Sequence, residues 1–319
     1  MDIEYTDTNW VKEGSLKFYN CDLELGGAND FEIGVNIKND CMSEGSLWYV
    51  SDTEYGGIVD KITINTEKEI VSYHGRSWRG VLQNKVIRPK KGQDYYIVSG
   101  DIHDILHTVI ADIDLYDLFH VPESRTGINI TYQFDRYCNA YEGITKMLAK
   151  QNMKLQISMI KDSLTIEAVP ISDLSEKYEY SDDYGMKIIL ENDSGGINHL
   201  ICLGRGELAD RTVIDLYVDA LGNICEKQVF FHEKEITSIY DFSNATSTEE
   251  LKEKGIETLE KEKSKNTISA TFQKLEVSVG DIVGGKNRLT GRTVKETVTK
   301  EIVKIKNGIE TITYKVGEE

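Results

Sequence analysis

The last part of the sequence, residues 275–317, most narrows what this chain can fold into. It reads LEVSVGDIVGGKNRLTGRTVKETVTKEIVKIKNGIETITYKVG, a series of short apolar runs separated by turn residues. Asn307-Gly308 stands between two runs in which apolar and polar residues alternate, the strongest local signal for a β-hairpin. A two-residue loop there would place Val303 opposite Ile312 on one face. The segment predicts strands suited to assembly or binding, and it carries no cluster of reactive groups.

Residues 1–99 also read as short strands. One run alternates strictly between apolar and polar positions, with Phe31, Ile33, Val35 and Ile37 on one face. Turn signals such as Gly26-Gly27 and Gly56-Gly57 separate this run from its neighbours. Several short strands at this spacing are typical of a barrel or a sandwich.

Residues 100–171 change period and predict a small α+β insert. Apolar residues recur at helical spacing between residues 100 and 119, with Ser99 or Asp101 available as the N-cap. A second helix is expected over residues 136–151 with Asp135 as its cap, followed by two strands around a turn at residues 161–163. This order of elements predicts a subdomain inserted between two β regions.

Residues 172–319 begin with a polar, acidic stretch and then return to strands, interrupted by one charged helix. The helix is expected over residues 247–265, where Ser247 and Glu250 form a capping box. Its narrow apolar stripe consists of Leu251, Gly255, Ile256 and Leu259, and it predicts a helix that docks on the protein surface. The predicted fold class is therefore mainly β (α+β), with a β-barrel domain at 1–99, an α+β subdomain at 100–171 and a second β-barrel domain at 172–319.

Charge and cysteine content exclude several classes of protein. The chain has 319 residues with 37 Lys and Arg against 54 Asp and Glu, a formal charge of −17. Such a chain is a poor ligand for nucleic acid, because affinity for DNA comes mainly from cations that contact phosphate. The five cysteines are scattered without metal-ligand spacing, so neither a zinc site nor a disulfide framework is expected. We expect no membrane segment, since no apolar run approaches the roughly 20 residues that a bilayer requires, and the acidic, mixed N-terminus is not a signal peptide.

Three segments, in order along the chain, resemble the tail hub proteins of phages and of prophage-derived tail particles. They are YHGRSWRGVLQNKVIRP (73–89), LICLGRGELADRTVIDLYVDALGNI (200–224) and GDIVGGKNRLTG followed by VTKEIVKIKNGIETITYKVG (280–317). The family is similar to the hub of contractile phage baseplates and to the upper part of the type VI secretion spike. The resemblance implies two tube-like β-barrels per chain and a homotrimer that presents six of them around one axis.

The resemblance also implies a function and partners. The homotrimer would form a ring that joins a six-fold tail tube to a three-fold spike or tip. The neighbours of this ring would be a tail tube or distal tail protein and a spike or fibre protein. DNA would pass through without specific binding. The negative charge of the chain would then either repel phosphate from the channel wall over about 10 Å or only keep the protein in solution. The expected location is the tail tip of a virion or phage-like particle assembled in a bacterial cytoplasm. Catalysis, cofactors and metals are not expected.

Several residues have the right type for chemistry without the surrounding pattern. His103 and His107 lie four apart on a predicted helix, and His120 follows, but the Glu of an HExxH metalloprotease is missing. Asp182-Asp183 and the pair Glu207 with Asp210 are carboxylates of the kind glycosidases use, yet such pairs arise by chance in an acidic chain. Residues 204–207 (GRGE) lack the Lys of a phosphate-binding loop, and they predict a bend between strands.

Trp78 stands in the sequence GRSWRG (75–80) between Arg76 and Arg79. Trp and Arg are enriched at interface hot spots, so the segment is interpreted either as an interface anchor or as a barrel end whose Arg side chains pair with local carboxylates. Two further functions stay open beside the tail hub. One is a tail-tip cell-wall or polysaccharide hydrolase. The other is a receptor- or carbohydrate-binding β module with an aromatic groove, for which tyrosines are available at Tyr95, Tyr96, Tyr178, Tyr180 and Tyr184.

Overall fold

The computed structural model describes residues 1–161, 163–175, 187–192, 195–220, 222–264, 266–271, 277–286 and 293–317, with 187–192, 266–271, 285–286 and 293–294 described by their backbone alone. Expectations on Asp182-Asp183, Tyr178, Tyr180 and Tyr184 lie outside these residues. The chain forms two compact units. The first unit joins Met1–Ile188 to Ser269–Val316, and the second unit is built from Ile189–Ile268.

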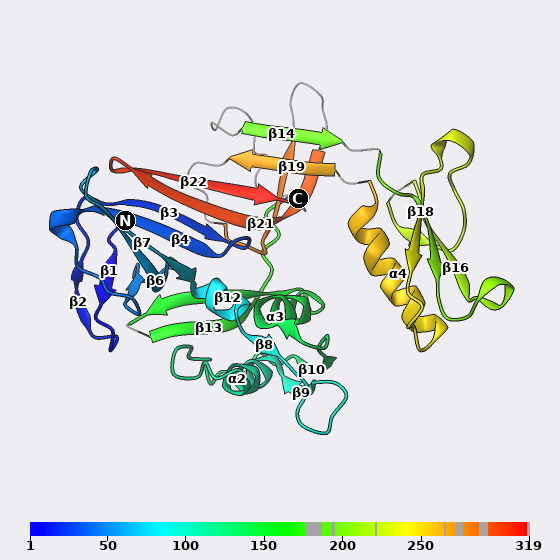
Figure 1. Cartoon of the computed structure of the whole chain (residues 1–319), viewed down its shortest axis with the longest axis horizontal. Helices are drawn as coiled ribbons and strands as arrows, with labels where there is room; N and C mark the ends of the chain where they lie inside the picture. The colour runs from blue at the N-terminus through cyan, green and yellow to red at the C-terminus, as the bar shows by residue number, and fades with distance from the viewer. Residues whose placement is uncertain are drawn as a thin grey trace. The chain divides into compact units, whose positions relative to one another are not determined.

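The first unit is built on a large sheet that takes strands from both ends of the chain (Figure 1). Its order is β14-β19-β22-β21-β3-β4-β7-β6-β5-β1-β2, with β20 paired to β21. The N-terminal strands are β1 (Glu4–Thr6), β2 (Lys12–Ser15), β3 (Asn20–Leu25), β4 (Asp30–Asn36), β5 (Leu47–Tyr49), β6 (Gly56–Asn65) and β7 (Ile70–Ser77). The later strands are β14 (Lys187–Asn192), β19 (Asn266–Thr271), β20 (Ile282–Lys286), β21 (Thr293–Lys306) and β22 (Ile309–Val316).

The C-terminal hairpin forms as the sequence predicts. Asn307 and Gly308 have φ values of 52° and 76°, the left-handed conformation that a two-residue hairpin turn requires at both positions. Val303 pairs with Ile312 across the hairpin, which confirms the predicted register. Val303 also pairs with Leu23 of β3, so the hairpin extends the N-terminal sheet.

The prediction of two tube-like barrels is not confirmed. Among the described strands the chain of pairings runs from β14 to β2 without closing on itself, so no barrel is found in that part of the chain. The mainly β character is confirmed. Strands β20–β22, expected in a second barrel, add to the sheet of the N-terminal strands, since the apolar face of β21 packs into the same core.

The α+β part of the first unit packs beside this sheet. It contains α1 (Trp78–Gln83), β8 (Val86–Ile87), β9 (Ile97–Asp101), α2 (Ile102–Asp112), β10 (Asn129–Gln133), β11 (Cys138–Asn139), α3 (Ala140–Ala149), β12 (Met153–Ile160) and β13 (Ser163–Pro170). Asp101 caps α2 by accepting a hydrogen bond from the His103 amide at 3.0 Å, as predicted. Lys154 of β12 forms an ion pair of 2.6 Å with Asp281, both nearly buried, and so ties this part to the segment before β20.

Helix α3 begins four residues later than the sequence predicts. Tyr137 has a φ of 56°, a left-handed conformation that a helix cannot contain. Asn139 is therefore the N-cap, accepting a hydrogen bond from the Glu142 amide at 2.8 Å. Asp135, the expected cap, instead forms an ion pair with Lys146.

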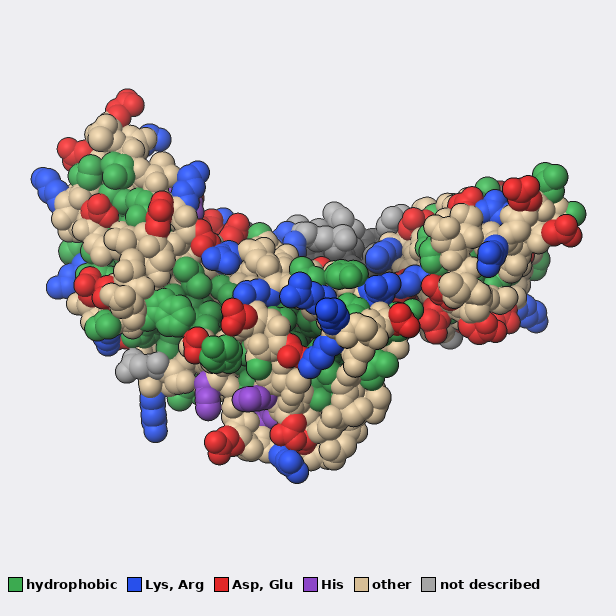
Figure 2. Space-filling model, turned by 60° about the horizontal axis from the view of Figure 1, so that its bottom comes forward, with side chains coloured by type: hydrophobic (Ala, Val, Ile, Leu, Met, Phe, Trp, Pro, Cys, Tyr) green, Lys and Arg blue, Asp and Glu red, His purple; other side chains and the backbone are tan. Residues whose placement is uncertain are grey.

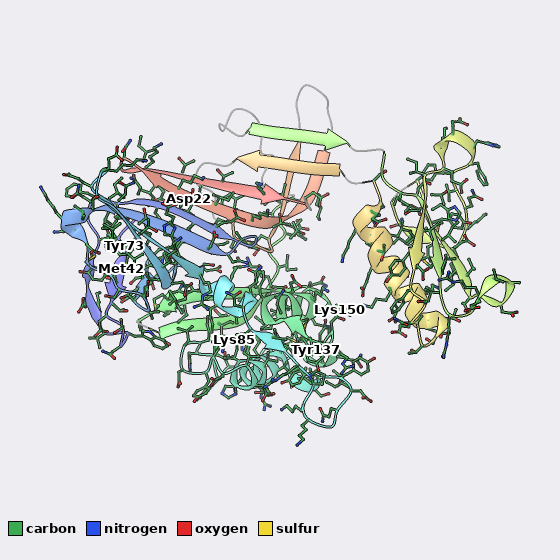
Figure 3. All side chains as sticks on the ribbon, viewed as in Figure 1. Asp22, Met42, Tyr73, Lys85, Tyr137 and Lys150 are labelled. Atoms are coloured by element: carbon green, nitrogen blue, oxygen red, sulfur yellow. The ribbon has the colours of Figure 1, made fainter. Side chains whose placement is uncertain are left out.

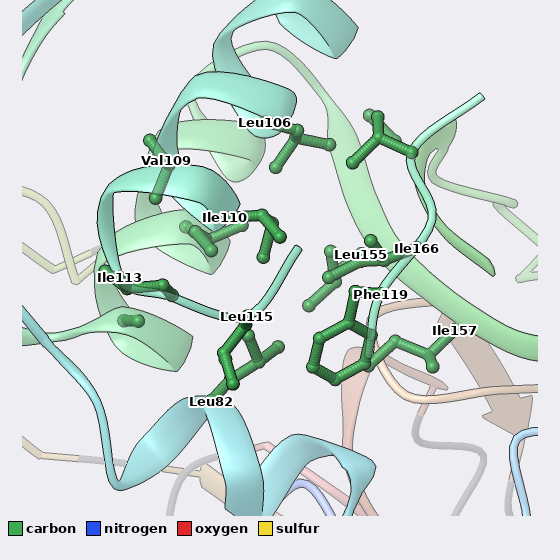
Figure 4. Packing of buried hydrophobic residues seen from close by; sticks show 14 of the residues in the cluster. Leu82, Leu106, Val109, Ile110, Ile113, Leu115, Phe119, Leu155, Ile157 and Ile166 are labelled. Atoms are coloured by element: carbon green, nitrogen blue, oxygen red, sulfur yellow. The ribbon is translucent and has the colours of Figure 1, made fainter. Parts of the chain in front are cut away.

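Two apolar clusters hold the first unit together. One is formed mainly by residues of the large sheet, and its largest buried side chains include Trp48, Phe31 and Tyr73. The other joins helices α1, α2 and α3 to strands β12 and β13; Figure 4 shows Leu106, Ile110, Phe119, Leu155 and Ile166 meeting there.

The second unit is a four-stranded sheet covered on one face by a helix. The sheet order is β17 (Ile224–Cys225), β16 (Val213–Val218), β15 (His199–Leu203) and β18 (Thr237–Asp241), with β15 and β18 parallel. The helix is α4 (Thr248–Glu262). Its buried residues are Leu251, Gly255 and Leu259, which belong to the predicted stripe. A Cβ on Gly255 would come within 2.5 Å of Cys202 Sγ, so the glycine permits close packing on the sheet.

The N-terminus of α4 forms half of the predicted capping box. Ser247 Oγ accepts a hydrogen bond from the Glu250 amide at 3.1 Å, as expected. The Glu250 carboxylate binds the amide and hydroxyl of Thr246 instead of the Ser247 amide. The predicted division into three domains, at 1–99, 100–171 and 172–319, stays a prediction. All five cysteines are free, and none of the helices in the described part of the chain is long and apolar enough to cross a membrane.

Candidate assembly surfaces and buried polar clusters

The predicted histidine group is not brought together as a site. His103 is buried, with Nδ1 2.6 Å from the Ser124 carbonyl and Nε2 3.2 Å from the Ala168 amide. The carbonyl can only accept and the amide can only donate, so the ring is neutral with its proton on Nδ1. His107 and His120 are exposed, and the described residues contain no group of three or more side chains placed to hold a metal.

The remaining motifs lie in connecting segments. Residues 204–212 link β15 to β16, where the Gly204 amide donates to the Thr212 carbonyl and the Thr212 amide donates to the Arg205 carbonyl. Gly206 has a φ of 108°. This geometry is the bend between strands that the sequence predicts. Glu207 and Asp210 are both exposed on this connection.

Trp78 is fully buried, so its side chain is not an exposed interface anchor. The two flanking arginines pair with local carboxylates, as one of the two interpretations expects. Arg76 forms a bidentate pair with Asp60 at 2.7 and 2.8 Å. Arg79 is 2% exposed and forms a bidentate pair with Glu54. The segment therefore belongs to the core of the first unit.

Arg79 is the centre of a buried polar cluster that sequence reasoning missed. Its Nη1 donates to Tyr141 Oη at 3.0 Å, and its guanidinium lies 5.7 Å from the centre of the same ring. Beside it, Tyr55 Oη donates to Glu301 Oε1 at 2.5 Å. The cluster links the loop before β6 to β21 across 246 residues of sequence.

Glu301 is 5% exposed. Burial raises the pKa of its carboxyl from 4.5 to about 7; the Tyr55 hydrogen bond and Arg79 oppose the rise, and the charge of Glu54 adds to it. A sequence signal for this placement exists, because Glu301 lies two residues before Val303 and so shares the inward face of β21. The pattern does not identify Tyr55 as its partner.

The outer face of the sheet is acidic. A hollow of about 580 Å³ lies over β3, β4, β6, β7 and β21, and we call its lining the acidic sheet face. The lining contains more carboxylates than cations. The carboxylates are Asp22, Glu24, Asp30, Glu32 and Asp60, and the cations are Lys61, Arg76 and Lys304. Figure 3 labels Asp22, which lines this hollow, and Tyr73 and Met42, which are buried in the core of the first unit.

Like charges crowd on the acidic sheet face. Arg76 and Lys304 pair with Asp60 and Asp22 at 2.7 and 2.8 Å. Partial burial raises the pKa of the Asp30 carboxyl, and the negative charges of Glu24 and Asp22 raise it further. This surface therefore carries an excess of negative charge that its own cations do not balance.

The second unit has its own polar cluster, on the sheet face away from α4. His199 lies between two carboxylates, with Nδ1 2.7 Å from Glu235 and Nε2 2.9 Å from Asp215. Its ring stacks on Tyr217 at a centroid distance of 4.4 Å. The residues come from β15, β16 and the loop before β18, so these contacts connect three neighbouring segments of the sheet.

Comparisons with known proteins identify the fold. No family model and no curated protein matches the sequence. Among solved structures, the prophage MuSo2 43 kDa tail protein from Shewanella oneidensis matches 100% of this chain and 98% of its own, with a TM-score of 0.61 and 10% identity. The tail protein from Neisseria meningitidis MC58 matches 99% of this chain and 96% of its own, with a TM-score of 0.56 and 11% identity.

A third structure extends the same finding. The prophage tail protein gp18 from Listeria monocytogenes EGD-e matches 100% of this chain and 95% of its own, with a TM-score of 0.52 and 12% identity. At such low identity the likeness concerns the fold. Over its whole length, this chain has the fold of prophage tail proteins.

Proposed function

We propose that this chain is a structural component of a phage or prophage-like tail, where copies of it form a hub ring that joins a six-fold tail tube to a three-fold spike or tip. The observation that carries the proposal is the full-length likeness in fold to three tail proteins. Because the match spans at least 99% of this chain and at least 95% of each neighbour, it concerns the combination of both units and not one common subdomain.

The open sheet of the first unit supports assembly. In the described part of the chain β2 has a partner on one side only, and such an edge presents unpaired backbone groups. We propose a homotrimer in which neighbouring copies cover the remaining apolar and edge surfaces. Obligate interfaces of this kind bury about 2,000 Å² or more.

The acidic sheet face supports a bore through which DNA passes without specific binding. Its excess of carboxylates would repel phosphate, and the repulsion reaches about 10 Å at ordinary ionic strength. We propose that this face lines the channel of the ring. The role is assembly and not catalysis, and it needs no cofactor.

The same proposal places the protein at the tail tip of a virion or phage-like particle assembled in a bacterial cytoplasm. Its neighbours there would be a tail tube or distal tail protein on one side and a spike or fibre protein on the other. A ring of three chains would match the three-fold spike directly, and each chain would then contact two subunits of the six-fold tube.

Negative-stain electron microscopy tests this function. The chain is mixed with the neighbouring tail components, and the class averages are compared with those of each component alone. We expect rings with three copies of the chain, and a native mass that agrees with three. A chain that stays monomeric beside every tube, distal tail and spike component would overturn the proposal.

A further inference from the structure

A groove with exposed aromatic side chains lies in the first unit, outside the acidic sheet face. It encloses about 460 Å³, within the range of roughly 300–1,000 Å³ found for small-molecule sites. Trp10 and Tyr116 are its exposed aromatic residues, at 45% and 60% exposure, and buried Tyr49, Met159 and Leu164 contribute its apolar lining. Figure 2 shows hydrophobic side chains gathered on this face of the first unit, beside histidine side chains.

The chain holds Trp10 in an unusual conformation. Its φ is 66°, a left-handed value that is uncommon for a bulky residue. The loop between β1 and β2 is fixed by Asp7, whose Oδ1 accepts hydrogen bonds from the amides of Asn9 and Val11, both at 2.8 Å. Backbone strain of this kind tends to occur at functional sites. The backbone that carries the indole is therefore fixed without a ligand.

The segment that carries Tyr116 is also rigidly anchored. Leu115 and Phe119, on either side of Tyr116, are both buried in the core beneath α2 (Figure 4). His120 then pairs with β13, through its amide to the Leu164 carbonyl at 2.8 Å and its carbonyl to the Ile166 amide at 2.9 Å. Tyr116 is thus an exposed aromatic side chain on a fixed backbone.

The lining of the groove also contains hydrogen-bond donors and acceptors. Lys12 supplies a donor, and its charge is balanced by Glu4 at 2.7 Å. Asp117 supplies an acceptor, and His120 and Ser163 are exposed beside it. The lining carries no excess of positive charge that would favour an anionic ligand.

We propose that this groove binds a neutral oligosaccharide. A pyranose ring has an apolar face of C–H groups that stacks on an aromatic ring and an edge of hydroxyls that both donate and accept hydrogen bonds. The groove offers both features, with aromatic side chains on anchored backbone segments and polar groups in the same lining. Aromatic residues on an anchored backbone lose little conformational entropy when a ligand binds, so even a ligand that makes few contacts can be held. Nucleic acid fits poorly, because the groove lacks the cationic surface that phosphates require.

The site is independent of the proposed ring, and intrinsic fluorescence of the full chain tests it. The chain has three tryptophans, and Trp48 and Trp78 are fully buried, so a ligand-dependent change in emission reports on Trp10. Cellotetraose, chitotetraose and maltotetraose are titrated in turn. We expect at least one to give a saturable change with a Kd of about 1 mM or below.

Two substitutions give the controls. Tyr116→Ala leaves Trp10 in place and should weaken binding by about tenfold or more. Tyr137→Ala removes an equally exposed tyrosine, 63% against 60%, that does not line the groove, and it should leave binding unchanged. Both variants should keep the melting temperature of the parent. The proposal is overturned if no glycan changes the emission, or if the change persists in Tyr116→Ala.

Discussion

At the scale of single residues, the most informative group is a carboxylate buried among partners from distant parts of the chain. Glu301 accepts a hydrogen bond from Tyr55. The charges of Arg79 and Glu54 lie close enough to shift the pKa of its carboxyl. Tyr314 of β22 also donates a hydrogen bond to it. Because this buried carboxyl is hydrogen-bonded from several sides, it favours one packing of the β21–β22 hairpin against the loop before β6. Its shifted pKa also makes the free energy of unfolding depend on pH.

We predict that the free energy of unfolding falls as the pH rises from about 4.5 to about 7. The folded chain retains the Glu301 proton across this window and the unfolded chain releases it, so this stabilisation is complete below pH 4.5 and is lost as the pH passes 7. The raised pKa corresponds to roughly 3 kcal/mol. Urea denaturation at a series of pH values measures the slope.

Two variants of this cluster make the pH prediction specific. Glu301→Gln removes the titrating group and should flatten the slope. Tyr55→Phe removes a hydrogen bond that holds the pKa of Glu301 down, so it should extend the loss of stability to higher pH. An unchanged slope in Glu301→Gln would show that other groups produce it.

At the scale of elements, most local signals predicted correctly, with the expected Asp135 cap as an exception, whereas the sequence did not predict the long-range strand pairing. The Asn307-Gly308 turn, the Val303–Ile312 register and the Asp101 and Ser247 caps all depend on residues close in sequence, and the structure confirms them. The pairing of β21 with β3 joins residues almost 280 positions apart. An alternating pattern shows which face of a strand is buried and not which strand lies beside it.

The same limit applies to the sites. Side chains alternate between the two faces of β21, and this alternation predicts that Glu301 points into the core. No residue near Glu301 in the sequence indicates that Tyr55 is its partner. The groove at Trp10 depends on a left-handed residue in a short loop and on a segment more than 100 residues away. Neither partner carries a motif. Trp78 was ambiguous in the sequence because its neighbours suit both an interface and a core, and only its burial decides between them.

The hairpin turn provides a test at this scale. Gly308 has a φ of 76°, and a Cβ there would meet nothing within 4 Å. Gly308→Ala should therefore lower the free energy of unfolding through backbone strain alone, by about 1–2 kcal/mol. Gly34→Ala, in β4 of the same sheet, is the matched control: its Cβ would make only ordinary contacts at 3.8 Å or more, so we expect a change within about 0.5 kcal/mol. Equal losses in both variants would contradict the explanation.

At the scale of the whole molecule, the features described above suit a part of a larger assembly. The first unit leaves β2 at the edge of its sheet within the described part of the chain, and one face of that sheet carries uncompensated negative charge. The fold is that of prophage tail proteins along the entire chain. The channel wall that we propose would need a face that repels DNA and sheet edges that neighbouring copies can cover. The first unit has an acidic sheet face and, in its described part, an open edge at β2.

A cryo-electron microscopy reconstruction of the chain assembled with its tail neighbours tests this account most directly. We predict three copies around one axis, with Asp22, Asp30 and Glu32 of the acidic sheet face turned toward an open channel. A map in which that face points outward or is buried against a neighbouring protein, or in which the chain is present as a single copy, would contradict the account.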